Sequence, residues 1–266
     1  MAEESNWLLR NYSKSNGLSQ NTITAIIEDK QGVIWVGTQF GVHKFDGYEF
    51  TAFNRNRLEQ GEGLLNDHIR SLAVDHQGRL WVGTDKGLYL YSPEKNNFVL
   101  FGAKNYFRAV ESLAVAHDGT LWVGGDDGLY QADTSAERLK KIALDGGNIT
   151  SLIIYGQSLF VVANGQQVHQ IIGDNNLVKT KYVGQTNQRV VDVEILSKDN
   201  MLVATSTGVM HVFDGQVIKI FPLRLQNANS LTRDNQGNIW VGTSSGLSMI
   251  SGLFEQVPNL HVIHTN

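Results

Sequence analysis

Aromatic, basic and imidazole side chains in this chain stand at positions where they could bind a ligand. The residues in question are Phe40, His68, Phe107, Arg108 and Arg189, which directly precede strand-like apolar runs or lie in short links between them. A guanidinium binds carboxylate or sulfate groups through paired hydrogen bonds, and an aromatic ring stacks on a sugar face. These residue types predict a site for a small molecule or a glycan. An acidic oligosaccharide is the first candidate, ahead of a peptide or a neighbouring subunit.

Other groups of reactive side chains give weaker signals. His261 and His264 lie three residues apart without a third ligand, and the adjacent Asp126 and Asp127 are typical of a solvated turn. No glycine-rich phosphate loop opens a helix, and no spacing singles out a Ser-His-Asp triad or a carboxylate pair. The chain has no cysteine, which excludes thiol chemistry and disulfides. We therefore predict no catalytic residue, no metal site and no cofactor.

The charge and hydrophobicity of the chain indicate which classes of binding partner to expect. The 266 residues carry 22 basic and 26 acidic side chains, a formal net charge of −4, which gives no reason to expect a nucleic acid. No apolar run approaches the roughly 18–20 residues that span a bilayer. The N-terminus has no basic region followed by an apolar one, so no signal peptide is expected in this chain. We expect no nucleic-acid partner and no membrane contact by this segment itself.

A short sequence motif recurs along the chain, and it defines the structural elements that position these side chains. It reads QGVIWVGT at 31–38, QGRLWVGT at 77–84, DGTLWVGG at 118–125 and QGNIWVGT at 236–243. The tryptophans Trp35, Trp81 and Trp122 lie 46 and 41 residues apart, and Trp240 follows after 118, close to three further periods. Two degenerate copies fill that interval, with Phe160 and Leu202 in the tryptophan position. The chain therefore carries six repeats of about 40 residues.

Each repeat contains four short runs rich in β-branched and aromatic residues. In the first repeat they are 22–28, 33–37, 42–45 and 48–53, and turn residues such as Asp29 and Gly32 separate them. A four-stranded unit of this length, repeated with little helical periodicity, predicts an all-β fold: a β-propeller of four-stranded antiparallel blades. Six blades is our prediction, and seven with one unrecognised blade is the alternative. The WVGT phrase is then a packing device, its tryptophan lying against the next blade.

The repeat boundaries predict one propeller domain over 1–266. The predicted blades are 18–53, 65–101, 105–142, 148–178, 187–221 and 226–257. The fourth strand of the last repeat is unclear, and residues 7–12 resemble the outer strands of the first two repeats. We predict that residues 1–14 close the last blade as its outer strand, with the tail after Ser251 as the competitor for that edge.

The predicted blades place the varying side chains at one end of the domain. Entries to the first strands contribute Thr22, His68, Ala109 or Arg108, Asn148, Arg189 and Asn227, and the links after the second strands contribute Phe40, Asp85, Lys86, Asp126 and Asp127. These positions differ between repeats while the scaffold recurs, which is where specificity is expected. The ligand-binding residues named above belong to this rim.

Residues 17–53, GLSQNTITAIIEDKQGVIWVGTQFGVHKFDGYEFTAF, closely resemble the two-component regulator propeller repeat. Residues 69–91 and 231–250 match it well, 105–132 match with Ala116 in place of the turn aspartate, and the repeats near 149–172 and 190–213 depart from it. The resemblance implies a periplasmic sensor propeller of a bacterial membrane protein whose output is a histidine kinase or a diguanylate cyclase. The repeat motif itself carries no catalytic residue.

Three classes of function are compatible with these features. The first, favoured by the resemblance, is a non-catalytic extracytoplasmic sensor that binds a ligand for a signal-transduction protein, located in the periplasm. The second is a propeller enzyme of the lyase or glycosidase type with its site at the channel mouth. The third is an interaction scaffold, for instance a homodimer. The fold alone does not decide among them.

Overall fold

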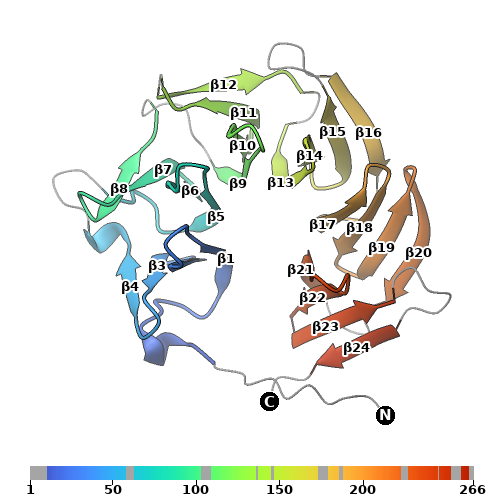
Figure 1. Cartoon of the computed structure of the whole chain (residues 1–266), viewed down its shortest axis with the longest axis horizontal. Helices are drawn as coiled ribbons and strands as arrows, with labels where there is room; N and C mark the ends of the chain where they lie inside the picture. The colour runs from blue at the N-terminus through green and yellow to red at the C-terminus, as the bar shows by residue number, and fades with distance from the viewer. Residues whose placement is uncertain are drawn as a thin grey trace. The chain divides into compact units, whose positions relative to one another are not determined.

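Six four-stranded antiparallel sheets make up the structure, which is a computed structural model (Figure 1). It describes residues 11–57, 63–102, 109–135, 137–144, 147–172, 179–185, 188–222, 227–244, 246–252 and 259–263. In every sheet the strands are hydrogen-bonded in chain order. The chain is a six-bladed β-propeller, as predicted. Within the described residues the helices are two short 3-10 turns, η1 (Lys14–Asn16) and η2 (Arg55–Arg57), and none is long and apolar enough to cross a membrane.

The sheets follow the sequence repeats. The first three consist of β1 (Ile23–Glu28), β2 (Ile34–Thr38), β3 (Gly41–Phe45) and β4 (Phe50–Phe53); β5 (Ile69–Val74), β6 (Leu80–Thr84), β7 (Gly87–Ser92) and β8 (Asn97–Leu100); and β9 (Val110–Val115), β10 (Leu121–Gly125), β11 (Gly128–Asp133) and β12 (Arg138–Ile142). The last three consist of β13 (Ile149–Tyr155), β14 (Ser158–Ala163), β15 (Gln167–Ile172) and β16 (Lys179–Gln185); β17 (Val190–Ser197), β18 (Asn200–Thr205), β19 (Gly208–Phe213) and β20 (Gln216–Pro222); and β21 (Ala228–Arg233), β22 (Ile239–Thr243), β23 (Gly246–Ser251) and β24 (Asn259–Ile263).

The chain divides into two compact units, 1–113 and 114–266, and each is described by itself. In the first unit one apolar cluster joins sheets one and two. In the second unit three clusters join sheets three and four, four and five, and five and six. Each sheet has two apolar faces that must be covered. A single blade is therefore not stable by itself and depends on packing against its neighbours.

The tryptophan of the repeated phrase is held by a hydrogen bond within its own sheet. The indole N–H of Trp35 donates to Asp29 at 2.7 Å, that of Trp81 to Asp75 at 2.9 Å and that of Trp240 to Asp234 at 2.8 Å. Each aspartate also caps the turn between the first and second strands, the role that the sequence predicts. Hydrogen bonds from Asn238 and Trp240 lower the pKa of Asp234 to about 2. The aspartate therefore joins the turn to the core of its blade.

The same tryptophan packs on the next sheet, as predicted. Trp35 is 1% exposed and meets Tyr91 of the second sheet edge-on, with ring centroids 4.8 Å apart. Phe98, also of the second sheet, lies 6.3 Å away. In the degenerate fourth and fifth repeats, Phe160 and Leu202 are 1% and 0% exposed in the tryptophan position. All of these repeats therefore place a buried aromatic or large aliphatic side chain at this position, whether or not they keep the tryptophan.

Two predicted boundaries differ from the structure. The fourth strand of the sixth sheet is β24, paired with β23 from Leu247–Ile263 to Ser251–Asn259, so this sheet takes its outer strand from the C-terminal tail, where we predicted residues 1–14. Of those residues, 1–10 lie outside the described part, and Tyr12 packs edge-on against Phe45 and Phe50 of the first sheet. In the fourth repeat the outer strand extends to Gln185, beyond the predicted end at 178.

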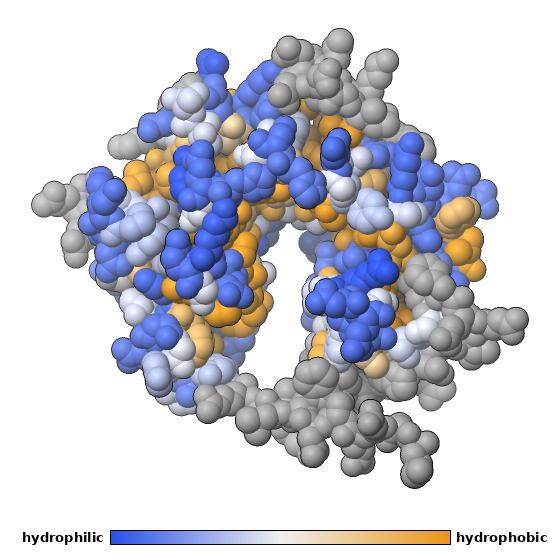
Figure 2. Space-filling view, viewed as in Figure 1, coloured by the Kyte–Doolittle hydropathy of each residue, from blue (hydrophilic) through white to orange (hydrophobic). Residues whose placement is uncertain are grey.

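The outer strand β20 of the fifth sheet carries exposed apolar side chains. Val217, Ile218 and Ile220 are 44%, 57% and 57% exposed, and Phe213 at the end of β19 is 51% exposed. Figure 2 shows hydrophobic surface over this strand at the right of the view. An apolar edge strand of this kind offers unpaired backbone groups to another chain.

Candidate functional site

The turn that follows the second strand is fixed by the threonine of the WVGT phrase. The Thr38 hydroxyl accepts a hydrogen bond from the Phe40 backbone N–H at 2.9 Å and donates to the Gly41 carbonyl at 3.1 Å. Thr84 repeats both bonds in the second sheet. Side chains in these turns are therefore presented in a fixed geometry. Phe40 occupies such a turn with its ring 54% exposed, which agrees with its predicted place on the surface.

A backbone hydrogen bond links the two segments that carry Phe40 and His68. The Gly41 N–H, next to Phe40, donates to the carbonyl of Asp67 at 2.8 Å, and Asp67 directly precedes His68. The Asp67 carboxylate in turn accepts the Arg55 N–H at 2.7 Å. The turn after β2 in the first sheet and the loop that enters β5 in the second sheet are thus joined by hydrogen bonds.

His68 begins a chain of hydrogen-bonded charged side chains. Its Nδ1 lies 2.9 Å from an Asp85 carboxylate oxygen, and the Arg70 Nε donates to the other oxygen of Asp85 at 2.6 Å. The Arg70 Nη1 donates to Glu111 at 3.0 Å. We call Phe40, His68, Arg70, Asp85 and Glu111 the rim cluster. All five lie in the first unit, on β5, β9, the entry to β5 and the two threonine-fixed turns.

A β-bulge directs Arg70 into the rim cluster. The pairing of β5 with β6 shifts between Ile69 and Ser71, which leaves Arg70 as the extra residue of the strand. The same shift occurs in β1, β13, β17 and β21. Bulges re-aim a side chain and are common next to functional sites. Arg70 and Glu111 were not predicted from the sequence, because a bulge has no signature in the amino-acid composition. The available indication was that each is the second residue of the first strand in its repeat.

The charges of the rim cluster are largely satisfied internally. Burial alone would raise the pKa of Asp85, but the hydrogen bonds from Arg70 and His68 outweigh it and hold that pKa below its ordinary value. The Arg70, Asp85 and His68 side chains are each about one-third exposed, so these pairs contribute little to stability, about 0–1 kcal/mol apiece. Their effect is to orient polar groups toward solvent. Two carboxylates pair with the one guanidinium, which disfavours an anionic ligand at this cluster.

The other predicted residues are placed differently. Arg189 belongs to the second unit and is exposed at the entry to β17, where its side chain lies against the turn that contains Gly165. Phe107 and Arg108 lie outside the described residues. Of the link residues, Asp127 accepts hydrogen bonds from Tyr130 at 2.7 Å and Lys141 at 3.2 Å, which is a local structural role. The acidic-oligosaccharide hypothesis relied on Arg108 and Arg189 and gains no support from the rim cluster.

The histidines of the third strands have structural roles. His43 is fully buried, and its Nε2 accepts the Ser19 backbone N–H at 2.9 Å. Burial lowers the pKa of His43, which keeps the imidazole neutral. His211 lies 2.6 Å from the Asn200 side-chain oxygen. Within the described part of the chain, no group of three or more His, Cys, Asp or Glu side chains could hold a metal ion. His264 lies outside that part.

Two acidic side chains on β17 of the second unit have raised pKa values. Asp192 accepts the backbone N–H of Leu231 on β21 at 2.7 Å and that of Val193 at 2.8 Å, but burial dominates and raises its pKa. Burial, and then the charge of Asp192, raise the pKa of Glu194, while Arg233 opposes the shift. The Asp192 carboxylate therefore links the first strands of sheets five and six.

The raised pKa of Asp192 predicts how stability depends on pH. The folded protein takes up this proton more readily than the unfolded chain, whose aspartates titrate near about 3.9. The contribution to stability is therefore fully present below that value and is lost as the pH rises through the folded-state pKa. We expect the wild type to gain unfolding free energy relative to Asp192→Asn as the pH falls from neutral to about 4. Urea unfolding across this range measures the difference, and parallel pH curves would contradict the assignment.

Comparison with known proteins identifies the class to which these repeats belong. Residues 17–40, 63–86 and 222–245 match the family model described as two component regulator propeller. The chain is thus a propeller that carries repeats of the two component regulator type, and the resemblance predicted from its sequence is confirmed. A histidine kinase of Formosa agariphila, Histidine kinase P4, is 40% identical over 55 residues, which are 21% of this chain and 4% of the kinase.

Solved structures share the fold. The extracellular domain of the putative hybrid two component system BT4673 from B. thetaiotaomicron has a TM-score of 0.74 at 22% identity, over 92% of this chain and 33% of that one. Virginiamycin B lyase from Staphylococcus aureus has a TM-score of 0.70 at 9% identity, over 92% of this chain and 85% of the lyase. The chain thus spans one third of the extracellular domain. At these identities the likeness concerns the fold alone.

Proposed function

We propose that this chain is the sensor propeller of a bacterial signal-transduction protein, that it lies in the periplasm, and that it binds a small ligand at the rim cluster without converting it. The observation that carries the proposal is the ordered set of charged side chains at the entry to β5, whose chain segment is hydrogen-bonded to the turn that exposes Phe40. The match to two component regulator propeller repeats supports the signalling role. The similar extracellular domain supports the location outside the cytoplasm.

The chemistry of the rim cluster favours a neutral saccharide over an acidic one. An exposed aromatic ring stacks on the apolar face of a sugar. Carboxylates accept hydrogen bonds from sugar hydroxyls, and the guanidinium and imidazole N–H groups donate to them. Asp85 and Glu111 flank Arg70, so an anionic ligand would meet two carboxylates before the guanidinium. The ligand class that fits both features is a neutral mono- or oligosaccharide.

A glycan titration tests this proposal. We expect at least one member of a panel of neutral oligosaccharides to raise the melting temperature, and its affinity to fall about tenfold in Phe40→Ala and in Arg70→Ala. Tyr48→Ala is the matched control, because Tyr48 is also an exposed aromatic of the first sheet, 92% exposed, but lies in the turn at the other end of β3. A glycan that binds all three variants with wild-type affinity would show that the rim cluster is not the site.

A lyase function is the second candidate, and one observation favours it. His68 and Asp85 form a hydrogen-bonded pair at 2.9 Å, an arrangement in which a carboxylate orients an imidazole as a general base. The shared fold with virginiamycin B lyase makes the comparison relevant. Mass spectrometry of each bound glycan after prolonged incubation separates the candidates. An unchanged mass supports the sensor, and a product that disappears in His68→Ala supports the enzyme.

The exposed edge of β20 favours the scaffold alternative, in which two copies associate. Sedimentation velocity of the wild type and of Ile218→Lys tests it. A dimer that the substitution converts to a monomer would support this alternative, and a monomeric wild type would exclude it.

A further inference from the structure

Besides the backbone N–H four residues later, the turn aspartate of the repeat binds two N–H groups, one on each carboxylate oxygen. One carboxylate oxygen accepts the tryptophan indole N–H six residues later, as in Asp29 with Trp35. The other accepts the backbone N–H two residues later, at 2.9 Å from Gln31 to Asp29, from Gln77 to Asp75 and from Gln236 to Asp234. Both oxygens of the carboxylate are therefore used in three repeats.

The third repeat keeps both donors and lacks the carboxylate. Ala116 stands in the aspartate position, while Trp122 is retained and is 8% exposed. Within the described residues, neither the Trp122 indole N–H nor the Asp118 backbone N–H has an acceptor in hydrogen-bond range. The Asp118 carboxylate is committed elsewhere, since it accepts the Thr120 N–H at 2.9 Å. The indole nitrogen of Trp122 is not fully buried, so a ligand can reach this donor.

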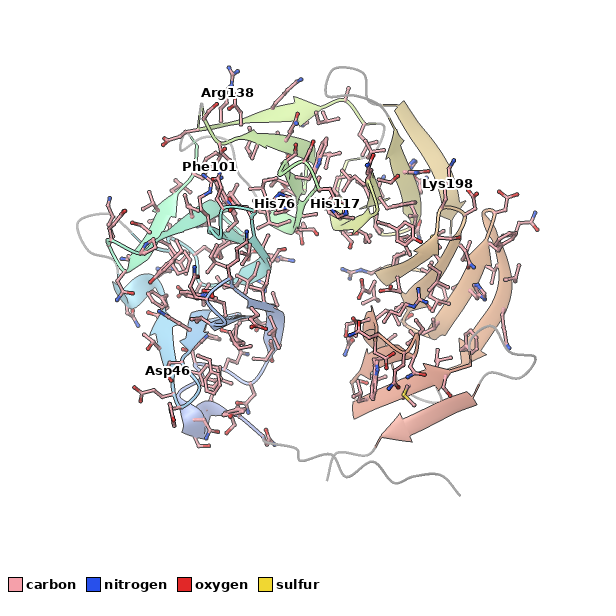
Figure 3. The ribbon with its side chains drawn as sticks, in the orientation of Figure 1. Asp46, His76, Phe101, His117, Arg138 and Lys198 are labelled. Carbon is pink, nitrogen blue, oxygen red and sulfur yellow. The ribbon has the colours of Figure 1, made fainter. Side chains whose placement is uncertain are left out.

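A cavity opens where the carboxylate is missing. Its volume is about 510 Å³, and its lining comes from the turn between β9 and β10, from Trp122, from the turn between β13 and β14, and from Leu159 and Ile171. Every lining residue belongs to the second unit. Figure 3 labels His117, which lies on the first of these turns beside Ala116 and is exposed. A cavity of this size holds a small organic molecule.

We propose that this cavity binds a small organic acid whose carboxylate takes the place that the turn aspartate holds in the other repeats. One ligand oxygen accepts the Trp122 indole N–H, and the other accepts the Asp118 backbone N–H. The two donors select a carboxylate over an amide, because an amide offers one acceptor oxygen and an N–H₂ group that cannot accept. Trp122, Leu159 and Ile171 provide apolar contact for the rest of the ligand. The site uses none of the residues of the rim cluster.

The test uses the whole ¹⁵N-labelled chain with benzoate and benzamide as matched probes. We expect benzoate to shift the Trp122 indole N–H resonance and the Asp118 amide resonance saturably, and benzamide to bind at least about tenfold more weakly. Trp122→Phe assigns the indole resonance, keeps an aromatic ring without the N–H donor and should weaken benzoate binding about tenfold. If benzoate leaves both resonances unmoved, or if benzamide binds equally well, the proposal is overturned.

Ala116→Asp tests the same inference from the protein side. The new carboxylate should occupy the site, raise the melting temperature and abolish benzoate binding. A variant that still binds benzoate, or that is less stable than the wild type, shows that the cavity is not the aspartate position and overturns the proposal. Glycan binding at the rim cluster is unaffected in either case, so the failure of one proposal is distinguishable from the failure of the other.

Discussion

Replacing Trp81 by alanine is expected to lower the free energy of unfolding by about 3–5 kcal/mol, the range for removing a large buried aromatic side chain. Trp81 is 0% exposed, its ring meets that of Phe101 edge-on at 4.9 Å, and the Arg79 guanidinium lies 5.3 Å from its centroid. Its indole is also a hydrogen-bond donor to Asp75, which is itself 4% exposed. The substitution therefore leaves a cavity and removes a donor from a buried carboxylate.

Chemical denaturation of Trp81→Ala and Trp81→Phe separates the two effects. Phenylalanine keeps most of the ring contacts and loses the hydrogen bond, so its expected loss is smaller, about 1–3 kcal/mol. Tyr48→Ala, at a 92% exposed aromatic of the same unit, is the control and should leave stability unchanged. A denaturation midpoint for Trp81→Ala that equals the wild-type value would mean that the repeated tryptophan does not support the fold.

The second large effect is expected for Gly83→Ala, at about 1–3 kcal/mol of destabilisation through overpacking. A Cβ on Gly83 would lie 2.6 Å from the Val110 Cγ1 and 3.0 Å from the Val110 carbonyl oxygen, at the first residue of the following sheet. Neither distance is compatible with an unstrained contact, so the backbone at Val110 must shift or its side chain must change rotamer. Thermal or urea unfolding of the variant measures the cost.

Combining Gly83→Ala with Val110→Ala provides the control for that mechanism. Truncating Val110 removes the closer of the two clashes, so the double variant should lose less stability than the sum of the single changes. Other residue pairs occupy this position in the chain: Val162 in the fourth sheet is followed by Val190 at the start of the fifth, and Ala204 in the fifth is followed by Ala228 at the start of the sixth, each pair buried in one apolar cluster. Additive losses would indicate that the glycine is needed for some reason other than the close approach.

The fold could be predicted from the sequence because the interactions that define a blade are local. The WVGT phrase, its turn residues and the spacing of about 40 residues are written in contiguous stretches, and even Phe160 and Leu202 could be recognised as substitutes by their register. The last strand was harder to place. Residues 7–12 and the C-terminal tail have comparable strand propensity, and only pairing with β23 distinguishes Asn259–Ile263 as the outer strand.

The site was predicted less completely, because its geometry depends on contacts between repeats. Phe40 and His68 were identified as varying residues on a repeating scaffold, and the structure joins their backbones through Gly41 and Asp67. The Arg70 side chain reaches the rim cluster through a bulge, and its partner Glu111 lies 41 residues further along the chain. Neither feature has a signature in residue types alone. The role of the turn aspartate as an indole acceptor also needed the three-dimensional structure.

The glycine contact also limits how the repeats of this chain can be rearranged during evolution. The bond between aspartate and tryptophan lies inside one blade and is copied whole when a gene segment is duplicated. The glycine contact connects two consecutive blades, so a duplicated blade carries only one of the two residues that form it. Gly37, Gly83 and Gly124 meet Ile69, Val110 and Ile149, all β-branched, so the contact has the same form between these repeats, whereas Val162 and Val190 take the two positions between the fourth and fifth sheets. Ala204 and Ala228 form a matched joint, and a repeat inserted between them with isoleucine at its start would bring a larger side chain against the Ala204 methyl group.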